Sequence, residues 1–182
     1  MPALRRSRPA LPRYAVAWFP HFEQLQRIEE FRRRHDPAAA LVPAHLSLVF
    51  PFATALSRLQ VETHVQRVAS RWPPVAVSFQ RVRLHANEFL FLMASRGAAA
   101  LGAFHDKLYT RSLQPHLRRE FPYEPHITLA RYADFARLES ALAEADEAFG
   151  AEFSAVMREV TLLSVEPNGR IGPLKSISLH TA

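Results

Sequence analysis

The sequence predicts two similar lobes built from strands and helices, with a cleft between them. The first observation is a doubled pattern, His-apolar-Ser/Thr-apolar, which occurs at residues 45–48 and again at 126–129. The second is the order of elements, because in each half a strand with this pattern is followed by a helix and then by two extended segments. This repetition predicts that the two patterned strands meet near a pseudo-two-fold axis.

The apolar periodicity assigns the first elements in order. The aromatic and apolar run 14–19 is typical of a strand and is ended by Pro20. Apolar residues at helical spacing predict a helix over 22–34. The alternating residues 45–50 predict the first patterned strand, which we expect to stop at Pro51 because proline has no backbone N–H to donate.

The middle of the chain continues with a helix and a group of strands. Apolar residues on one helical face predict a helix over 54–70. Residues 75–79 and 82–94 predict further strands, with a hairpin turn at 86–88. An alanine-rich segment predicts a helix over 98–113.

The last third contains the second patterned strand, over 126–131. An amphipathic helix is predicted over 135–149, and the segment 153–165 is largely extended. The sequence Pro-Asn-Gly at 167–169 is a strong turn signal. A final strand with alternating residues is predicted over 174–180.

The composition bounds the class of protein. Of the 182 residues, 48% are hydrophobic and 13 are Phe, enough for one substantial core. We therefore expect a single two-lobed domain over 13–182, preceded by a flexible basic tail over 1–12. The absence of cysteine excludes disulfides and thiolate metal sites, and no apolar run approaches the roughly 18 residues of a membrane span. These features predict a cytoplasmic protein without a membrane partner.

The chain is basic, with 23 Lys and Arg against 17 Asp and Glu, a net charge of +6 and a pI near 10.4. Only Lys107 and Lys175 are lysines, so arginine supplies nearly all of the positive charge. The planar guanidinium suits bidentate contacts with phosphate. The charge favours anionic partners such as nucleic acid, although an arginine-rich composition without such a partner is an alternative reading.

The doubled pattern carries the chemistry. Successive side chains of a strand point to opposite faces, so the histidine and the hydroxyl of each copy share one face while the apolar residues anchor the other. If the two strands face each other, the cleft holds two imidazoles and two hydroxyls. One imidazole can accept a proton while the other donates one, because the pKa of histidine is near 6.5, and the hydroxyls can hold anionic oxygens. This set suits acid–base chemistry on a phosphodiester.

The two patterns resemble the HxTx motifs of the 2H phosphoesterase superfamily, in particular its bacterial 2′,5′ RNA ligase and RNA 2′,3′-cyclic phosphodiesterase branch. The first motif has Ser47 where that branch more often has threonine. The resemblance implies an α+β fold of two lobes, each an antiparallel sheet with flanking helices, around a central cleft. It implies the opening of RNA or nucleoside 2′,3′-cyclic phosphate to a 2′-phosphate without metal or cofactor, and some relatives also join RNA ends through a 2′,5′ bond.

The resemblance also assigns roles, although the symmetric sequence itself does not fix which histidine is acid and which is base. His45 would be the acid that serves the leaving 3′-oxygen, and His126 the base that activates water. The expected substrate-binding residues, which are the motif hydroxyls, a nearby arginine and two aromatic residues for base stacking, are Ser47, Thr128, Arg131, Phe50 and Tyr123. The expected partners are RNA ends or cyclic nucleotides, and a monomer suits the enclosed cleft.

Other readings of these residues remain open. A catalytic zinc site usually needs three protein ligands, and the sequence has no cysteine, His-x-His or His-Glu-x-x-His pattern, so no metal site is predicted. The other seven histidines, His85 among them, are interpreted as structural. The clusters Arg32-Arg33-Arg34 and Arg118-Arg119 are interpreted either as solvated surfaces or as guides for RNA. The alternative function is an RNA- or nucleotide-binding module of the same fold with little or no turnover.

Overall fold

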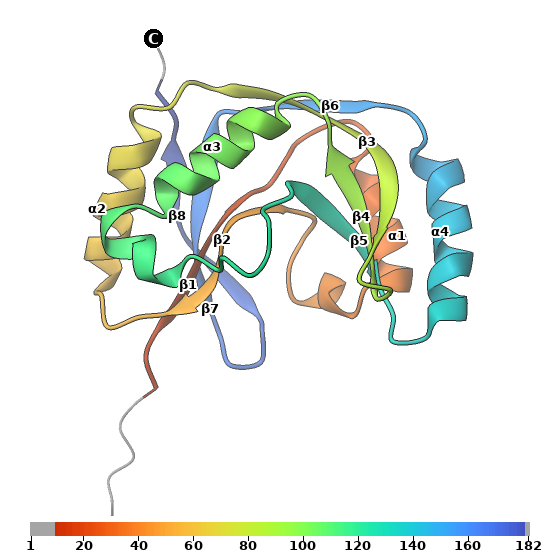
Figure 1. The fold of residues 1–182 in the computed structure, drawn as a ribbon, viewed down its shortest axis with the longest axis horizontal. Helices are drawn as coiled ribbons and strands as arrows, with labels where there is room; N and C mark the ends of the chain where they lie inside the picture. The colour runs from red at the N-terminus through yellow and green to blue at the C-terminus, as the bar shows by residue number, and fades with distance from the viewer. Residues whose placement is uncertain (1–9, 181–182) are drawn as a thin grey trace, which may run out of the picture.

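The computed structural model describes residues 10–180 and contains two four-stranded antiparallel sheets flanked by helices (Figure 1). The strands of the first sheet, in sheet order, are β2 (Leu46–Ala53), β1 (Arg13–Trp18), β7 (Glu159–Val165) and β8 (Ile171–Ser178). Those of the second sheet are β5 (His126–Arg131), β4 (Phe89–Ala94), β3 (Val75–His85) and β6 (Phe153–Met157). The predicted fold class, α+β with two lobes of antiparallel sheet and flanking helices, is confirmed.

The two patterned strands occupy equivalent places. β2 and β5 are each the edge strand of their sheet, and each pairs with the strand that precedes it in the chain, β1 or β4. They also contact one another where the sheets meet. This matches the pseudo-two-fold arrangement that the repeated sequence pattern predicts.

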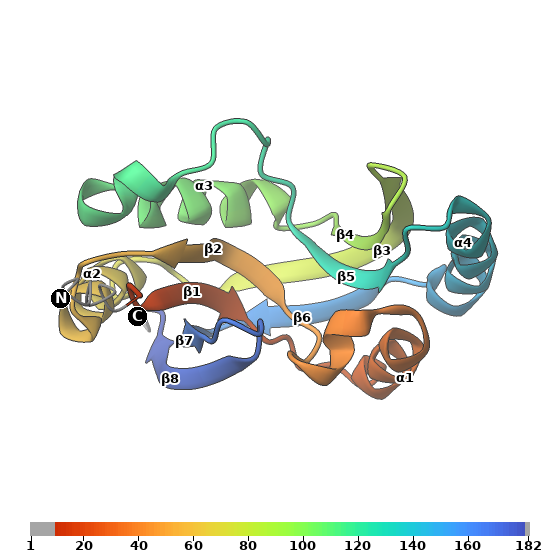
Figure 2. The ribbon, with the colours of Figure 1, turned by 90° about the horizontal axis from the view of Figure 1, so that it is seen from below.

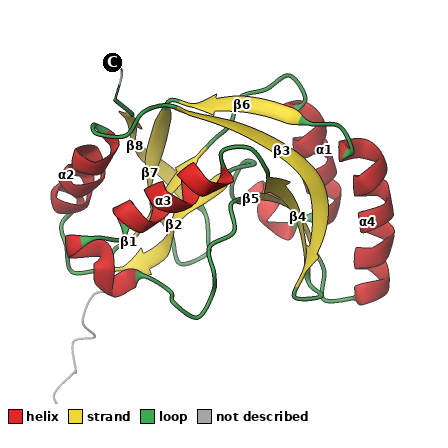
Figure 3. Ribbon diagram, turned by 45° about the horizontal axis from the view of Figure 1, so that its top comes forward, coloured by secondary structure: helices red, strands yellow, loops and turns green. Residues whose placement is uncertain are grey.

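The helices are α1 (Leu25–His35), α2 (Arg58–Ala69), α3 (Ala98–Leu108) and α4 (Phe135–Phe149), with short 3₁₀ turns η1 (Pro37–Ala40) and η2 (Arg111–His116). α1 connects two strands of the first sheet but packs on the second, whereas α3 connects two strands of the second sheet but packs on β2 of the first (Figure 2). α2 and α4 lie at opposite ends of the molecule (Figure 3). This exchange of helices ties the two sheets together, and no helix among residues 10–180 is long and apolar enough to cross a membrane.

One cluster of buried apolar side chains runs through both sheets. It contains the apolar residues of both patterns, Leu46, Leu48, Ile127 and Leu129, which have no exposed surface. Alternation along β2 and β5 therefore sends these side chains into the core and leaves the histidine and hydroxyl of each pattern on the other face.

Several predicted boundaries are wrong for identifiable reasons. β2 does not stop at Pro51 but continues to Ala53, because an edge strand can place a missing N–H on its free side. The predicted helix over 54–70 begins only at Arg58, where Ser57 and Gln60 form a reciprocal capping box. The N-terminal tail lies mostly outside the described residues.

Two backbone irregularities also depart from the prediction. Residues 75–79 and 82–85 form a single strand, β3, with a bulge at Arg81, whose φ is 72°. The predicted helix over 98–113 ends at Leu108, and Arg111, with a φ of 52°, begins η2. The extended segment 153–165 divides into β6 and β7, which belong to different sheets.

Candidate active site

The two motif histidines are held by the same contact. The imidazole Nδ1 of His45 lies 2.8 Å from the carbonyl oxygen of Pro43, and that of His126 lies 2.6 Å from the carbonyl oxygen of Glu124. A carbonyl can only accept, so each Nδ1 carries the hydrogen. In the neutral imidazole, Nε2 is then unprotonated and can accept a proton from a bound molecule.

Burial sets the protonation state of these histidines. Both are partly buried, and burial lowers the pKa of His126 to about 4 and also lowers the pKa of His45. A proton on the neighbouring imidazole of His45 would lower the pKa of His126 further by charge repulsion. Both imidazoles are therefore neutral at pH 7 in the unliganded protein.

A cavity of about 300 Å³ lies beside the patterned strands. Its lining includes Ser47, His126 and Thr128, which brings together the hydroxyls of both patterns and one of the two histidines. His45 does not line it among the described residues, and its ring lies against Phe19 with 5.8 Å between the centroids. A larger hollow of about 540 Å³, near Arg81, contains no motif residue.

The cavity has an aromatic wall. Phe91 of β4 stacks on His126, with 3.5 Å between the ring centroids and 15° between the planes, and it also stacks on His85 at 4.7 Å. The aromatic residues in the lining are Phe50, Phe89, Phe91 and Phe121. Such a wall offers flat apolar surface to a nucleobase.

A charged group supports the second histidine. The guanidinium of Arg83 donates to the carboxylate of Glu124, which lowers the pKa of that carboxyl, and Nδ1 of His85 lies 3.9 Å from the same carboxylate. The backbone carbonyl of Glu124 in turn accepts from His126. β3 thus fixes the residue that orients His126, although nothing in the local sequence around 83–85 indicates it.

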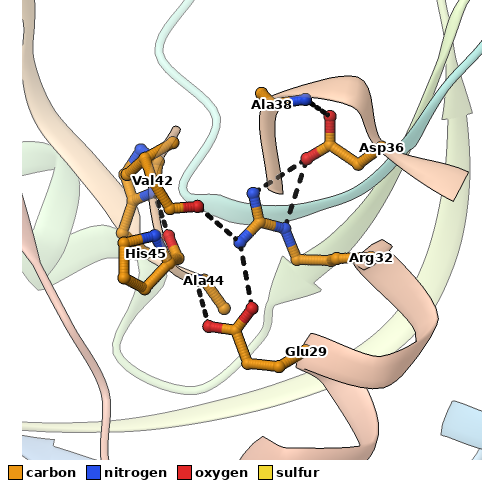
Figure 4. Close-up of polar contacts among 8 residues, drawn as sticks. Glu29, Arg32, Asp36, Ala38, Val42, Ala44 and His45 are labelled. Carbon is orange, nitrogen blue, oxygen red and sulfur yellow. Dashed lines mark hydrogen bonds and ion pairs between the residues drawn. The ribbon is translucent and has the colours of Figure 1, made fainter. Parts of the chain in front are cut away.

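The loop that carries His45 rests on a buried ion network (Figure 4). The reading of Arg32 as a solvated residue or a guide for RNA is wrong, because its side chain on α1 is only 2% exposed. Its guanidinium donates to the carboxylate of Asp36, to that of Glu29 and to the carbonyl oxygen of Val42. Glu29 accepts from the backbone N–H of Ala44 at 2.6 Å. The network therefore fixes the backbone on both sides of Pro43, the residue whose carbonyl orients His45.

The remaining predicted residues lie differently. Tyr123 does not line the cavity; its hydroxyl donates to the carbonyl oxygen of Ser47 at 2.8 Å, and its ring stacks on His105 at 3.7 Å. His105 bonds the carbonyl oxygen of Leu48, so these side chains occupy the free edge of β2. Tyr123 thus supports the strand that bears Ser47.

Arg131 lies at the end of β5, outside the cavity lining. Its guanidinium pairs with Glu88 at 2.6 Å and lies over the ring of Phe89, 5.1 Å from the centroid. Phe89 itself lines the cavity, so Arg131 lies one side chain away from it.

Sequence reasoning missed several lining residues. His85 and Phe91 come from the β3–β4 hairpin, carry no motif, and reach the site only because β4 pairs with β5. Arg118, which the sequence offers as a solvated residue or as a guide for RNA, comes from the segment after η2 and also lines the cavity. The sequence does predict a hairpin turn at 86–88, but it does not show that this hairpin pairs with the second patterned strand. Among the described residues no three metal-binding side chains cluster.

Comparison with known proteins identifies a family and several relatives. A family model described as the 2′-5′ RNA ligase superfamily matches residues 19–168. A "Putative phosphoesterase" of Bacillus licheniformis is 26% identical over 122 residues, which cover 65% of this chain and 70% of that protein. A protein of the same description from Halalkalibacterium halodurans is 27% identical over 130 residues, covering 69% and 73%.

Solved structures share the fold. Escherichia coli LigT in its apo form has a TM-score of 0.63 at 20% identity, covering 93% of this chain and 98% of LigT. LigT in complex with 3′-AMP has a TM-score of 0.60 at 20% identity, covering 93% and 99%. A Thermus thermophilus protein, TT0787, has a TM-score of 0.59 at 22% identity, covering 92% and 97%.

Proposed function

The chain belongs to the 2′-5′ RNA ligase superfamily of 2H phosphoesterases, and from this premise we propose that it opens RNA or nucleoside 2′,3′-cyclic phosphates to 2′-phosphates by two-histidine acid–base catalysis without metal. The matched pair of histidines carries the proposal. Both bind a carbonyl through Nδ1, have no hydrogen-bond partner for Nε2 among residues 10–180, and lie at edge strands that contact each other. The complex of E. coli LigT with 3′-AMP supports a nucleotide ligand.

The proposed reaction breaks the bond between phosphorus and the ribose 3′-oxygen. Nε2 of His126 takes a proton from water as the water oxygen attacks phosphorus. Nε2 of His45 gives its proton to the departing 3′-oxygen, so the product has a 2′-phosphate and a 3′-hydroxyl. His45 gains that proton in the complex, because an anionic phosphate beside an imidazole raises its pKa.

The other side chains hold the substrate. Ser47 and Thr128 would donate to the non-bridging oxygens, whose charge grows in the transition state. Phe50 would bind the base, since stacking on an aromatic ring contributes roughly 1–3 kcal/mol per base. Arg131 remains a proposed phosphate contact, for which it would have to leave Glu88, and Arg118 is a second cation at the cavity. The same groups would serve to join RNA ends through a 2′,5′ bond, with a 5′-hydroxyl attacking phosphorus in place of water and the 3′-oxygen leaving as before.

We expect the wild-type protein to hydrolyse nucleoside 2′,3′-cyclic phosphates in the presence of EDTA, with the nucleoside 2′-phosphate as the sole product. The reason is that both proton transfers are assigned to side chains of the chain itself. Chromatography of the reaction mixture with 2′- and 3′-phosphate standards measures this. Retained binding without turnover would favour the binding module, and activity abolished by the chelator would favour a metal enzyme.

A further inference from the structure

A second hollow lies away from the catalytic cavity, between the end of α2 and the start of η2. It has a volume of about 270 Å³, and the charged side chains in its lining are Arg67, Arg71, Lys107 and Arg111. Among the described residues, no aspartate or glutamate lines it. Within residues 10–180 none of these four cations forms an ion pair with a carboxylate.

One of the four cations is held in place by a buried histidine. Nε2 of His64 lies 2.8 Å from the carbonyl oxygen of Leu108 and must donate to it, so Nδ1 is the acceptor. That Nδ1 receives a hydrogen bond from the guanidinium of Arg67 at 2.7 Å. His64 is 2% exposed, and burial lowers its pKa, which keeps it a neutral acceptor. A fixed guanidinium loses less entropy when it binds an anion than a free one does.

The basic surface continues into a neighbouring hollow. Arg71 and Trp72 line both hollows, and the second, of about 500 Å³, adds Arg96 and no carboxylate from the part of the chain that the structure describes. Trp72 is half-buried against Phe104 and therefore offers a rigid ring between the cations. We call this continuous surface, lined by Arg67, Arg71, Trp72, Arg96, Lys107 and Arg111, the basic groove.

We propose that the basic groove binds the phosphodiester backbone of single-stranded RNA whose 3′ end occupies the catalytic cavity. Cations spread along a groove fit a polyanion better than a single phosphate, arginine forks suit phosphate oxygens, and an aromatic ring among them suits an unpaired base. The inference rests on the proposed function in that it makes an RNA end, rather than a free cyclic nucleotide, the substrate.

The chain connects the groove with the cavity. Arg111 begins η2 and Arg118, seven positions later, lines the catalytic cavity. Seven residues span at most about 25 Å, which bounds the distance between these two cations. A 2′,3′-cyclic phosphate terminates a strand, so only the nucleotides on its 5′ side are left to follow η2 toward the groove.

Neutralising two exposed cations of the groove tests the proposal. We expect Arg71→Gln/Lys107→Gln to weaken the binding of a labelled ten-nucleotide RNA with a 3′-hydroxyl end about tenfold at 0.15 M salt. The slope of log affinity against log salt should fall by about 1.4, since each phosphate contact on a single strand contributes about 0.7. Fluorescence anisotropy over a salt series measures both quantities, and hydrolysis of a mononucleotide cyclic phosphate should be unchanged.

The control is Arg33→Gln/Arg137→Gln, which removes the same charge from exposed positions on α1 and α4, helices that lie far from α2 in Figure 1. Equal weakening by both double variants, or no RNA binding by the wild type, would overturn the proposal. Calorimetric loss of inorganic phosphate binding with unchanged RNA affinity would assign the groove to free phosphate and overturn it as well. If the groove variant loses RNA affinity as expected but the wild type does not hydrolyse a mononucleotide cyclic phosphate, the proposed function is rejected and RNA binding by the groove is not.

Discussion

The His126→Ala protein is expected to hydrolyse nucleoside 2′,3′-cyclic phosphates about 10²- to 10⁴-fold more slowly than the wild type, because a positioned general base contributes a factor of that size. His45→Ala should fall in the same range. Since both imidazoles serve one transition state, the double variant should be little slower than either single variant. Steady-state rates at fixed pH, with thermal unfolding as a check on folding, measure this.

The matched control is His21→Ala, which removes an exposed histidine that belongs to neither motif. It should retain wild-type rates. An equal loss of activity in all three single variants would show that replacing any histidine impairs the protein. Near-normal rates in His126→Ala would show that this histidine is not the catalytic base.

The pH dependence of the wild-type rates is a second test of the two-histidine mechanism. Burial lowers the pKa of both imidazoles, that of His126 to about 4, so the maximum of kcat/KM should lie below pH 6.5. The bound phosphate favours the protonated imidazoles and raises their pKa values, so the kcat profile should lie at higher pH than the kcat/KM profile. The two apparent pKa values of each pH profile describe the pair of histidines together and are not assigned to one residue each.

Replacing Arg32 by methionine should lower the free energy of unfolding by about 3–5 kcal/mol, because it leaves buried carboxylates without their cation. Asp36 is 6% exposed and Glu29 is partly buried, and both lose a charge-assisted hydrogen bond. Asp36 keeps one contact, from the backbone N–H of Ala38, which favours the lower end of the range. Urea unfolding measures the change.

Arg33→Met is the matched control, since the side chain of Arg33 is 63% exposed on the same helix and its ion pair with Glu30 spans 3.9 Å. It should change stability by less than about 1 kcal/mol. A loss in Arg32→Met no larger than this would contradict the network's role. Adding Glu29→Gln and Asp36→Asn to Arg32→Met should restore part of the stability, because the stranded charges are then removed.

The sequence predicts those parts of the site that depend on alternation within a single strand. Alternation within each pattern places Ser47 and Thr128 opposite the buried Leu48 and Leu129, and the cavity contains both hydroxyls. The family predicted from the two motifs is confirmed.

What the sequence does not reveal depends on pairing between distant segments. Nothing local indicates that α1 packs on the sheet of β5, or that Arg32 of this helix holds the loop before His45. His85 lies in the cavity only because its hairpin joins the second motif strand. Tyr123, adjacent to the motif in sequence, instead bonds the backbone of the opposite motif strand, since the turn before β5 brings it to the free edge of β2.

A crystal structure with a bound nucleoside 2′-phosphate, the proposed product, tests the shared action of the two imidazoles most directly. We expect Nε2 of His45 and Nε2 of His126 each within hydrogen-bond distance of oxygen atoms on the same phosphate, with the hydroxyls of Ser47 and Thr128 on its remaining oxygens. A phosphate that contacts only one of the two histidines, or that binds outside the motif strands, would contradict the account.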